Sequence, residues 1–313
     1  ENSDSVVFAS FLLDQLGRDD DDHFSAEAAS HFRTASSVAG TFCSQLAWLP
    51  PTGQTSSGTL VACLGRGQIA AVHDPADIAP VLTDVTTEWM KASRTPGCPV
   101  VCWQDVEGRV LVAASGGDER VQLGFCQKHQ VRFDCEATAS GSICHLRLEF
   151  LHNHLMLLTA TIDEVVCSWL RVSDDGVALR SARCRVLVRG SPMPCRFLAT
   201  HSGSPERFSV VVGRGSDVGL LTICRPASKR GSPTANLELQ AGHDSSVVMS
   251  TCIAGTDAKA FHVFTLDGAG LGRWWRAADR METVSTCSSV APTISKMSHF
   301  RMGSAVFYEQ GGG

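Results

Sequence analysis

Several features that would assign this sequence to a well-defined class of protein are missing. No two cysteines form a CxxC pair, and the nearest spacing, Cys98 to Cys102, lies where a strand is expected to begin, so no metal site is predicted. No window is apolar for the roughly eighteen residues that a membrane-spanning helix requires. The opening residues, ENSDSVVF, lack the basic-then-apolar order of a signal peptide. These absences predict a protein that does not insert into a membrane.

A strong charge of one sign is also lacking. The formal net charge is −5, so the overall field does not favour a nucleic-acid backbone, and direct contact with nucleic acid is not expected. The 13 cysteines lie between Cys43 and Cys287, many of them inside apolar runs. This distribution predicts buried free thiols in a reducing compartment, and hence an intracellular protein, cytoplasmic or nuclear.

The usual signatures of catalysis are equally scarce. The glycine-rich run 213–219 resembles a phosphate-binding loop, but an apolar strand pattern follows it where a helix would be needed. His152 and His154 have no acidic or cysteine partner at a metal-ligand spacing. We therefore predict no catalytic residue, no cofactor, no metal ligand and no small-molecule substrate, and expect the protein not to be an enzyme.

What the sequence does contain is a length and composition that suit a large β domain. A chain of 313 residues with 43% apolar residues can form one domain with a continuous core, and 28 glycines supply turns. We predict a single domain over residues 1–313. Residues 17–38, which include the run Asp19 to Asp22, are expected to form an acidic surface loop. Because the chain starts at Glu1, we expect it to be part of a larger protein.

Short runs rich in β-branched and aromatic residues recur from residue 40 onward, separated by turn signals. They group into five units of four predicted strands. The first two units comprise 42–49, 59–64, 68–73 and 78–85, then 100–104, 109–114, 121–126 and 131–135. The third and fourth comprise 144–150, 155–161, 165–172 and 177–188, then 195–200, 208–213, 218–224 and 235–239. The fifth comprises 247–253, 260–265, 271–275 and 282–287.

The turn between the second and third strand of each unit recurs at similar intervals. These turns contain Arg66, Asp118, Asp163, Asp217 and Asp267, at spacings of 52, 45, 54 and 50 residues. Four-stranded units at such a spacing are typical of propeller blades, because a single blade exposes both faces and only a ring buries them. We predict an all-β fold, a β-propeller of four-stranded antiparallel blades. Tail strands at 294–300 and 305–308 and a head strand within 5–16 would close the ring, with six blades favoured over seven.

Two of the units resemble the WD-repeat family of β-propellers. In the third, Thr159 and Thr161 match the family's hydroxyl segment, Asp163 its turn aspartate, and Trp169 its tryptophan six residues later. In the fifth, Gly242-His243 matches the Gly-His pair of the repeat, Thr265 the hydroxyl, Asp267 the turn aspartate, and Trp274 the tryptophan, one residue late. The other units depart from the pattern, so the resemblance, over about residues 40–290, is to a degenerate WD-like propeller. The family's hydrogen-bonded chain of His, hydroxyl, Asp and Trp implies a structural network at Thr161, Asp163, Trp169, His243, Thr265, Asp267 and Trp274.

The WD resemblance implies a rigid ring that presents polar side chains to other proteins. We therefore predict a non-enzymatic scaffold for protein–protein interaction inside a multi-subunit complex, with protein subunits or peptides as partners. Candidate partner-binding residues are Arg183, Arg185, Arg189 and Arg196, a basic ridge suited to an acidic peptide, together with Trp275. Two alternatives remain: a nucleic-acid-associated subunit of a ribonucleoprotein, and a propeller enzyme in which Asp118, Asp163, Asp217 and Asp267 converge at the central channel.

Overall fold

The structure of the chain is a computed structural model. It describes residues 6–7, 34–35, 43–50, 59–64, 68–73, 82–85, 99–127, 130–174, 176–188, 193–225, 232–253, 260–267 and 269–287. In these ranges all regular structure is β, and every strand pairing is antiparallel. The all-β class predicted from the sequence is thus confirmed for the described part of the chain.

Twenty strands form five four-stranded sheets, each built from four strands that are consecutive in the sequence. The first sheet contains β3 (Cys43–Leu49), β4 (Thr59–Leu64), β5 (Gln68–His73) and β6 (Leu82–Asp84). The second contains β7 (Val100–Val106), β8 (Arg109–Ser115), β9 (Arg120–Gln127) and β10 (Gln130–Thr138). The third contains β11 (His145–Leu151), β12 (His154–Ala160), β13 (Glu164–Ser173) and β14 (Gly176–Leu187).

The fourth sheet contains β15 (Arg196–Ser204), β16 (Arg207–Arg214), β17 (Asp217–Cys224) and β18 (Thr234–Ala241). The fifth contains β19 (Val247–Ile253), β20 (Phe261–Asp267), β21 (Gly272–Ala277) and β22 (Met281–Cys287). These twenty strands are the five predicted units, with bounds that differ by a few residues. A separate two-stranded pair joins β1 (Val6–Val7) to β2 (Thr34–Ala35).

The burial of each strand depends on its place in the sheet. Second and third strands are buried on both faces: in β8 every residue after Arg109 is buried, and β12 is buried throughout after His154. Outer strands alternate, as in β10 and β18, where exposed and partly buried residues follow one another. A sheet with two apolar faces must cover both of them, so each sheet needs a neighbour on either side.

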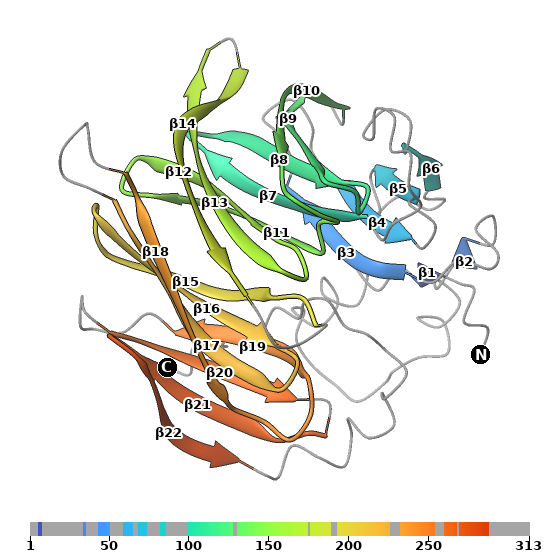
Figure 1. The fold of residues 1–313 in the computed structure, drawn as a ribbon. Helices are drawn as coiled ribbons and strands as arrows, with labels where there is room; N and C mark the ends of the chain where they lie inside the picture. The colour runs from blue at the N-terminus through green and yellow to red at the C-terminus, as the bar shows by residue number, and fades with distance from the viewer. Residues whose placement is uncertain are drawn as a thin grey trace, which may run out of the picture.

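The neighbours are the preceding and following sheets in the chain. Four hydrophobic clusters fill the spaces between the first and second, second and third, third and fourth, and fourth and fifth sheets. The first strand of each sheet contacts the first strand of the next sheet, in the order β3, β7, β11, β15 and β19. Figure 1 shows the result, a curved row of sheets that runs from the blue first sheet to the red fifth sheet. Successive four-stranded antiparallel sheets packed face to face are consistent with propeller blades.

Some of the predicted elements cannot be compared with the structure. The tail strands 294–300 and 305–308 lie outside the described residues, as does the acidic range 17–38 apart from β2. In the head segment 5–16, only the two residues of β1 are described. Ring closure and the number of blades therefore stay predictions.

Candidate functional site

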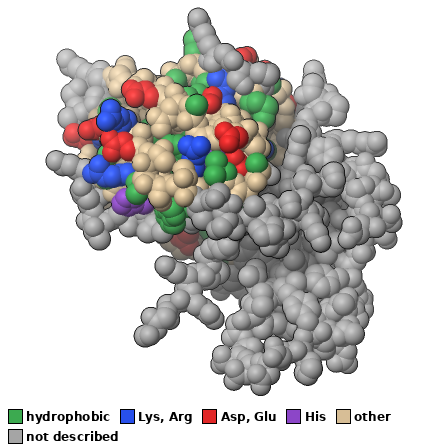
Figure 2. Space-filling model, turned by 90° about the horizontal axis from the view of Figure 1, so that it is seen from below, with side chains coloured by type: hydrophobic (Ala, Val, Ile, Leu, Met, Phe, Trp, Pro, Cys, Tyr) green, Lys and Arg blue, Asp and Glu red, His purple; other side chains and the backbone are tan. Residues whose placement is uncertain are grey.

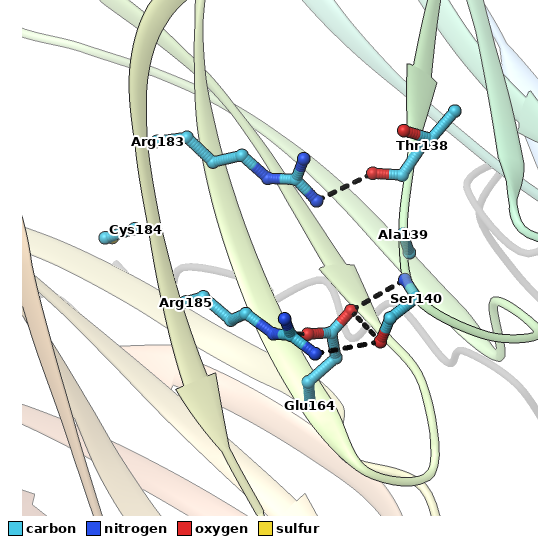
Figure 3. A pocket seen from close by; sticks show the side chains of 7 residues that line it. All are labelled: Thr138, Ala139, Ser140, Glu164, Arg183, Cys184 and Arg185. Atoms are coloured by element: carbon cyan, nitrogen blue, oxygen red, sulfur yellow. Dashed lines mark hydrogen bonds and ion pairs between the residues drawn. The ribbon is translucent and has the colours of Figure 1, made fainter.

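The arginines of β14 lie where strand alternation places them. Arg183 and Arg185 point to one side of β14 and Cys184 to the other, and the two guanidinium groups reach toward the end of β10 (Figure 3). Both arginines are exposed. Strand alternation therefore puts Arg183 and Arg185 on one side of β14, facing the second sheet.

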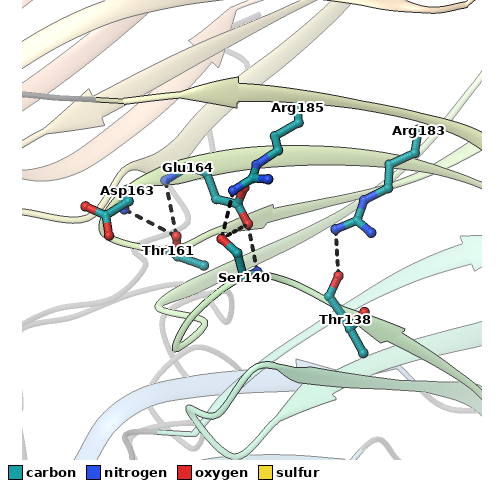
Figure 4. Close-up of polar contacts among 7 residues, drawn as sticks. All are labelled: Thr138, Ser140, Thr161, Asp163, Glu164, Arg183 and Arg185. Carbon is teal, nitrogen blue, oxygen red and sulfur yellow. Dashed lines mark hydrogen bonds and ion pairs between the residues drawn. The ribbon is translucent and has the colours of Figure 1, made fainter.

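Each of these two guanidinium groups is bound to the neighbouring sheet. Arg183 donates a hydrogen bond of 2.7 Å to the carbonyl oxygen of Thr138, the last residue of β10. Arg185 donates a bond of 3.1 Å to the Ser140 hydroxyl and forms an ion pair with Glu164. The arginines of the third sheet thus fasten it to the second sheet (Figure 4).

Glu164 lies at the centre of these contacts, although only 1% of its side chain is exposed. Its Oε1 accepts hydrogen bonds of 2.8 Å from the Ser140 amide and 2.7 Å from the Ser140 hydroxyl. Burial alone would raise the pKa of the Glu164 carboxyl, but the hydrogen bonds from Ser140 and the charge of Arg185 outweigh it and lower the pKa. Glu164 is therefore a stable carboxylate at neutral pH.

A tight turn sets the position of Glu164. The Thr161 hydroxyl accepts hydrogen bonds of 3.3 Å from the Asp163 amide and 3.2 Å from the Glu164 amide, and the Thr161 amide donates to the Glu164 carbonyl at 2.9 Å (Figure 4). Hydroxyl-to-backbone bonds of this kind stabilise short turns. The turn therefore fixes Glu164 as the first residue of β13, with its carboxylate directed at Ser140.

These residues line a cleft of about 430 Å³ between the second and third sheets (Figure 3). The lining residues are Thr138, Ala139, Ser140, Glu164, Arg183, Cys184 and Arg185. Ser140 and Glu164 are a hydroxyl and a carboxylate in contact, but a carboxylate with a lowered pKa is a poor base for a serine hydroxyl. The arrangement is better suited to binding, since guanidinium N–H groups on the rim can receive a carboxylate.

Of the other two predicted partner-binding arginines, Arg189 lies outside the described residues. Arg196 is exposed at the start of β15, and its positive charge lowers the pKa of His145 in the neighbouring sheet. Burial, followed by the charges of Arg196 and Arg147, lowers the pKa of His145 to about 3. His145 is consequently neutral in the folded protein at physiological pH.

A second polar cluster lies between the fifth sheet and the link that precedes it, and contains three residues of the predicted network. His243 Nε2 and Thr265 Oγ1 are 2.7 Å apart, and His243 Nδ1 lies 3.4 Å from Asp267 Oδ2. Both the His243 and the Asp267 side chains are fully buried. Burial lowers the pKa of His243 although Asp267 opposes this effect, so the imidazole is held neutral. His243 therefore lies between the Thr265 hydroxyl, which its Nε2 contacts, and the Asp267 carboxylate, which lies beside its Nδ1.

The tryptophan of this cluster is Trp275, so its assignment to Trp274 was wrong by one residue. The Trp275 indole donates a hydrogen bond of 2.7 Å to the Thr265 hydroxyl. Trp274 faces the opposite side of the sheet, against Phe264 at a centroid distance of 5.0 Å. The turn that begins at Asp267 is closed by a hydrogen bond from the Asp267 amide to the Leu271 carbonyl, whereas the turn of the third sheet runs only from Thr161 to Glu164. Because the turn of the fifth sheet is longer, the alternation of side chains brings residue 275 to the inner side.

The same observation corrects the role predicted for Trp275. Its side chain is 0% exposed and belongs to the cluster between the fourth and fifth sheets, so it is not available to a partner. The error arose because two adjacent tryptophans on a strand must face opposite sides, and the sequence does not say which one faces inward.

The third sheet does not form an equivalent network. Trp169 is 2% exposed within the cluster between the third and fourth sheets, and no hydrogen-bond partner of its indole nitrogen is found among the described residues. The Thr161 hydroxyl is used by its own turn, and Asp163 is exposed. The Trp169 indole therefore takes no part in the turn that Thr161 and Asp163 form, and the side chains of these three described residues are not linked to one another.

No protein-family model matches this sequence, and no curated protein sequence matches it. One solved structure with a similar shape is that of Raptor from Chaetomium thermophilum, at 13% sequence identity and a TM-score of 0.48. The match covers 81% of this chain and 21% of that chain, so the chain spans about a fifth of Raptor's length. At this TM-score the likeness supports neither a fold nor a function.

Two of the four turn aspartates predicted for an enzyme site use their carboxylates within their own turns. Asp267 accepts hydrogen bonds from the amides of Ala269 and Leu271, at 3.0 and 2.8 Å, and contacts His243. Asp118 accepts one of 3.1 Å from the Arg120 amide, while Asp163 is exposed and Asp217 begins β17. Within the described ranges, no group of three or more His, Cys, Asp or Glu side chains could hold a metal ion.

The surface on the underside of the molecule in Figure 1 carries charges of both signs. Figure 2 shows acidic and basic side chains interspersed among uncharged ones in its described part. Ion pairs involving the fifth sheet include Arg207 with Asp279 at 2.9 Å and Arg280 with Glu282 at 3.1 Å. A continuous basic field, as nucleic-acid binding would require, is not seen on this face among the described side chains. In the described chain there is also no helix with the length and hydrophobicity of a membrane span.

Proposed function

We propose that this chain is a degenerate WD-like β-propeller that serves as a non-enzymatic scaffold for protein–protein interaction in an intracellular multi-subunit complex, cytoplasmic or nuclear. One observation carries the proposal: five consecutive four-stranded antiparallel sheets pack face to face, and their first strands contact one another in sequence order. Such a row leaves an apolar face at each end unless it closes on itself. Strands from the two termini would complete the ring as a sixth blade.

The cleft between the second and third sheets is the partner-binding site that we favour. Arg183 uses one N–H group on Thr138, and its other guanidinium donors remain on the exposed side of the cleft. A carboxylate from a partner can bind such a guanidinium with two parallel hydrogen bonds. The turn built on Thr161 and the contacts of Glu164 hold the cleft in one geometry, so little ordering is needed on binding.

The partner segment should therefore be acidic, and a defined probe can test this. We expect a fluorescein-labelled hexaglutamate peptide to bind the protein and to be released by added salt, since exposed charges are screened. Arg183→Glu should weaken this binding about tenfold or more, because one guanidinium–carboxylate pair of about 1.5 to 3 kcal/mol is replaced by repulsion.

The matched control is Arg180→Glu, which reverses an exposed charge on the same strand outside the cleft. Equal loss of binding in both variants would contradict the assignment of the cleft.

Affinity purification of the full-length parent protein, unchanged or with either substitution, then tests the scaffold role. We expect a stable set of co-purifying proteins that is reduced by Arg183→Glu and kept by Arg180→Glu; a parent protein that elutes alone would contradict the scaffold role.

A further inference from the structure

Behind the arginine cleft, two cysteines face each other across neighbouring strands. The register of β13 and β14 places Cys167 directly opposite Cys184. Directly opposite residues on antiparallel strands point to the same face, with Cα atoms about 4.5 to 5.5 Å apart. A disulfide needs a Cα separation of about 4.4 to 6.8 Å. A bond between these two sulfur atoms is therefore compatible with the paired strands as they stand.

This juxtaposition is not repeated in the other registers of the described strands. The residues opposite cysteines elsewhere include Val131 for Cys126, Leu123 for Cys135, Ile69 for Cys63, Ala113 for Cys102 and Val263 for Cys252. A third thiol, Cys195, lies in the same hydrophobic cluster as the pair but on the link before β15. Among the described cysteines, strand pairing thus selects Cys167 and Cys184.

The two thiols have different environments, which gives them different roles. Cys184 is 7% exposed and sits between Arg183 and Arg185, with its side chain turned away from them (Figure 3), whereas Cys167 is 2% exposed. A hydrogen bond from the Cys167 thiol lowers the pKa of Cys184, while burial raises the pKa of Cys167. Cys184 is therefore the thiol that ionises and is oxidised first, and Cys167 is the one positioned to react with it.

We propose that Cys184 and Cys167 form a peroxide-sensitive pair that closes to a disulfide between β13 and β14. In the first step the Cys184 thiolate attacks one oxygen of hydrogen peroxide, the O–O bond breaks, and Cys184 becomes a sulfenic acid while hydroxide leaves and takes up a proton. In the second step the Cys167 sulfur attacks the sulfenic sulfur. The S–S bond forms, the S–O bond breaks, and the hydroxyl leaves as water with the Cys167 proton, so two sulfurs are oxidised and one peroxide is reduced.

The disulfide would add a covalent link beneath the arginine cleft. The bond would join β14 to β13 at the residue between Arg183 and Arg185, and would close the chain between positions 167 and 184. Cross-linking limits the unfolded chain, so the oxidised protein should unfold at a higher temperature than the reduced protein. This inference does not depend on the proposed scaffold function, because it concerns the thiols alone.

The test uses Cys224→Ser as the parent, since Cys224 is exposed and would react with peroxide by itself. The parent is treated with hydrogen peroxide, alkylated, digested with chymotrypsin and analysed by mass spectrometry. Trypsin is unsuitable because it cuts on both sides of Cys184. We expect one linked peptide pair containing Cys167 and Cys184, lighter by two hydrogen atoms than the separate peptides, and its loss on reduction with dithiothreitol.

Further variants in the same parent make the test decisive. Cys195→Ser should keep the linked peptide pair and the rise in unfolding temperature on oxidation. Cys167→Ser should lose both, and its Cys184 should remain a sulfenic acid that dimedone labels. A linkage of Cys184 to Cys195, a sulfinic acid at Cys184 with Cys167 unlinked, or two unreacted thiols would each overturn the proposal. Unfolding curves of the reduced variants show whether each one is folded before peroxide is added.

Discussion

Among single side chains, a buried tryptophan of the fifth sheet and a histidine of the link before that sheet meet at one hydroxyl. Trp275 donates to Thr265, which also contacts His243, and the indole packs in the cluster between the fourth and fifth sheets. The same chain of groups was expected from the WD resemblance, but with Trp274. Residue identities alone could predict that such a cluster exists; the side on which each tryptophan lies depends on the length of the preceding turn.

We predict that Trp275→Phe lowers the free energy of unfolding by about 2 to 3 kcal/mol, because it removes a buried donor and leaves a gap. Trp274→Phe is the matched control and should cost less than about 1 kcal/mol, since Trp274 is only partly buried and lies on the side of the sheet away from the cluster. Urea denaturation of both variants measures the difference. Similar losses in the two variants would show that the indole of Trp275 has no special role.

His145 should make the protein sensitive to mild acid. Its pKa is lowered to about 3 in the folded state, whereas an unfolded histidine titrates near pH 6.5. Between these values the unfolded chain takes up a proton that the folded chain does not, so the free energy of unfolding falls as the pH drops below about 6.5. At about pH 5 this one residue should cost about 2 kcal/mol relative to pH 7.

His145→Gln should remove that part of the pH dependence. The introduced amide keeps an acceptor for the Phe197 amide, which His145 Nδ1 contacts at 3.4 Å, but has no proton to gain. Denaturation at about pH 7 and about pH 5, where most carboxylates are still ionised, measures the change for both proteins. An equal loss in the variant and the parent would assign the acid sensitivity to other groups.

Among the strands and sheets, arginines fasten one sheet to the next. Besides Arg183 and Arg185, Arg147 of β11 donates 3.4 and 3.2 Å bonds to the carbonyls of Phe197 and Leu198 in β15, and Arg109 donates two of 3.3 Å to the Ser173 carbonyl. Arginine outnumbers lysine 22 to 5 in the sequence. A guanidinium with several donors in a fixed plane suits such contacts better than an ammonium group does.

Glu164→Gln tests this fastening at the cleft. The variant leaves Arg185 without its counter-ion and weakens the two bonds from Ser140, so we expect a loss of about 2 to 3 kcal/mol in the free energy of unfolding. Glu238→Gln, on the exposed outer strand β18, is the control and should change stability by less than about 0.5 kcal/mol. Chemical denaturation compares them, and matching values would contradict the role of Glu164.

Two glycines show how closely third and fourth strands approach. A Cβ atom on Gly124 of β9 would lie 1.8 Å from the carbonyl oxygen of Arg132 in β10, and one on Gly219 of β17 would lie 2.2 Å from that of Glu238 in β18. The backbone of the outer strand occupies the space that a side chain would need. Any larger residue must therefore displace the outer strand.

Gly124→Ala should consequently lower the free energy of unfolding by about 1 to 3 kcal/mol, through forced movement of β10. Gly141→Ala is the control, because a Cβ atom there would meet nothing within 4 Å. Thermal unfolding distinguishes them. If Gly141→Ala costs as much as Gly124→Ala, the cost does not come from the close approach of the strands.

The sequence predicted the elements better than it predicted the contacts between them. Strand runs and turn signals are local, and all twenty strands of the five sheets follow from them. The cleft is not local: Ser140 and Glu164 are 24 residues apart and meet only when the second and third sheets pack. Glu164 looks like one more polar turn residue in the sequence, and no periodic signal marks it as the buried partner of Arg185.

For the molecule as one body, the proposed closure of the ring requires chain from both ends. The first and fifth sheets are the ends of the described row, and the cluster between successive sheets is what stabilises each of them. If residues 294–308 supply two strands of a sixth blade, their removal should expose apolar faces of the sheets beside them.

We therefore predict that a chain ending at residue 293 unfolds several degrees below the full chain, since a destabilisation of about 1 kcal/mol lowers the melting temperature by about 2 °C for a domain of this size. A chain ending at residue 308 is the control and should unfold as the full chain does. Differential scanning calorimetry of the three chains measures the effect. An unchanged melting temperature for the shorter chain would exclude tail residues from the closure.

The packing of each sheet against its sequence neighbours has a consequence for biosynthesis. Each sheet is built from consecutive strands, and the four clusters join sheets that follow one another in the chain. A nascent chain emerging from the ribosome can thus complete one sheet, dock the next upon it, and keep hydrophobic surface covered on one side throughout translation. Slow translation between successive sheets should then help the polypeptide avoid aggregation, since each new sheet finds the preceding sheet already made.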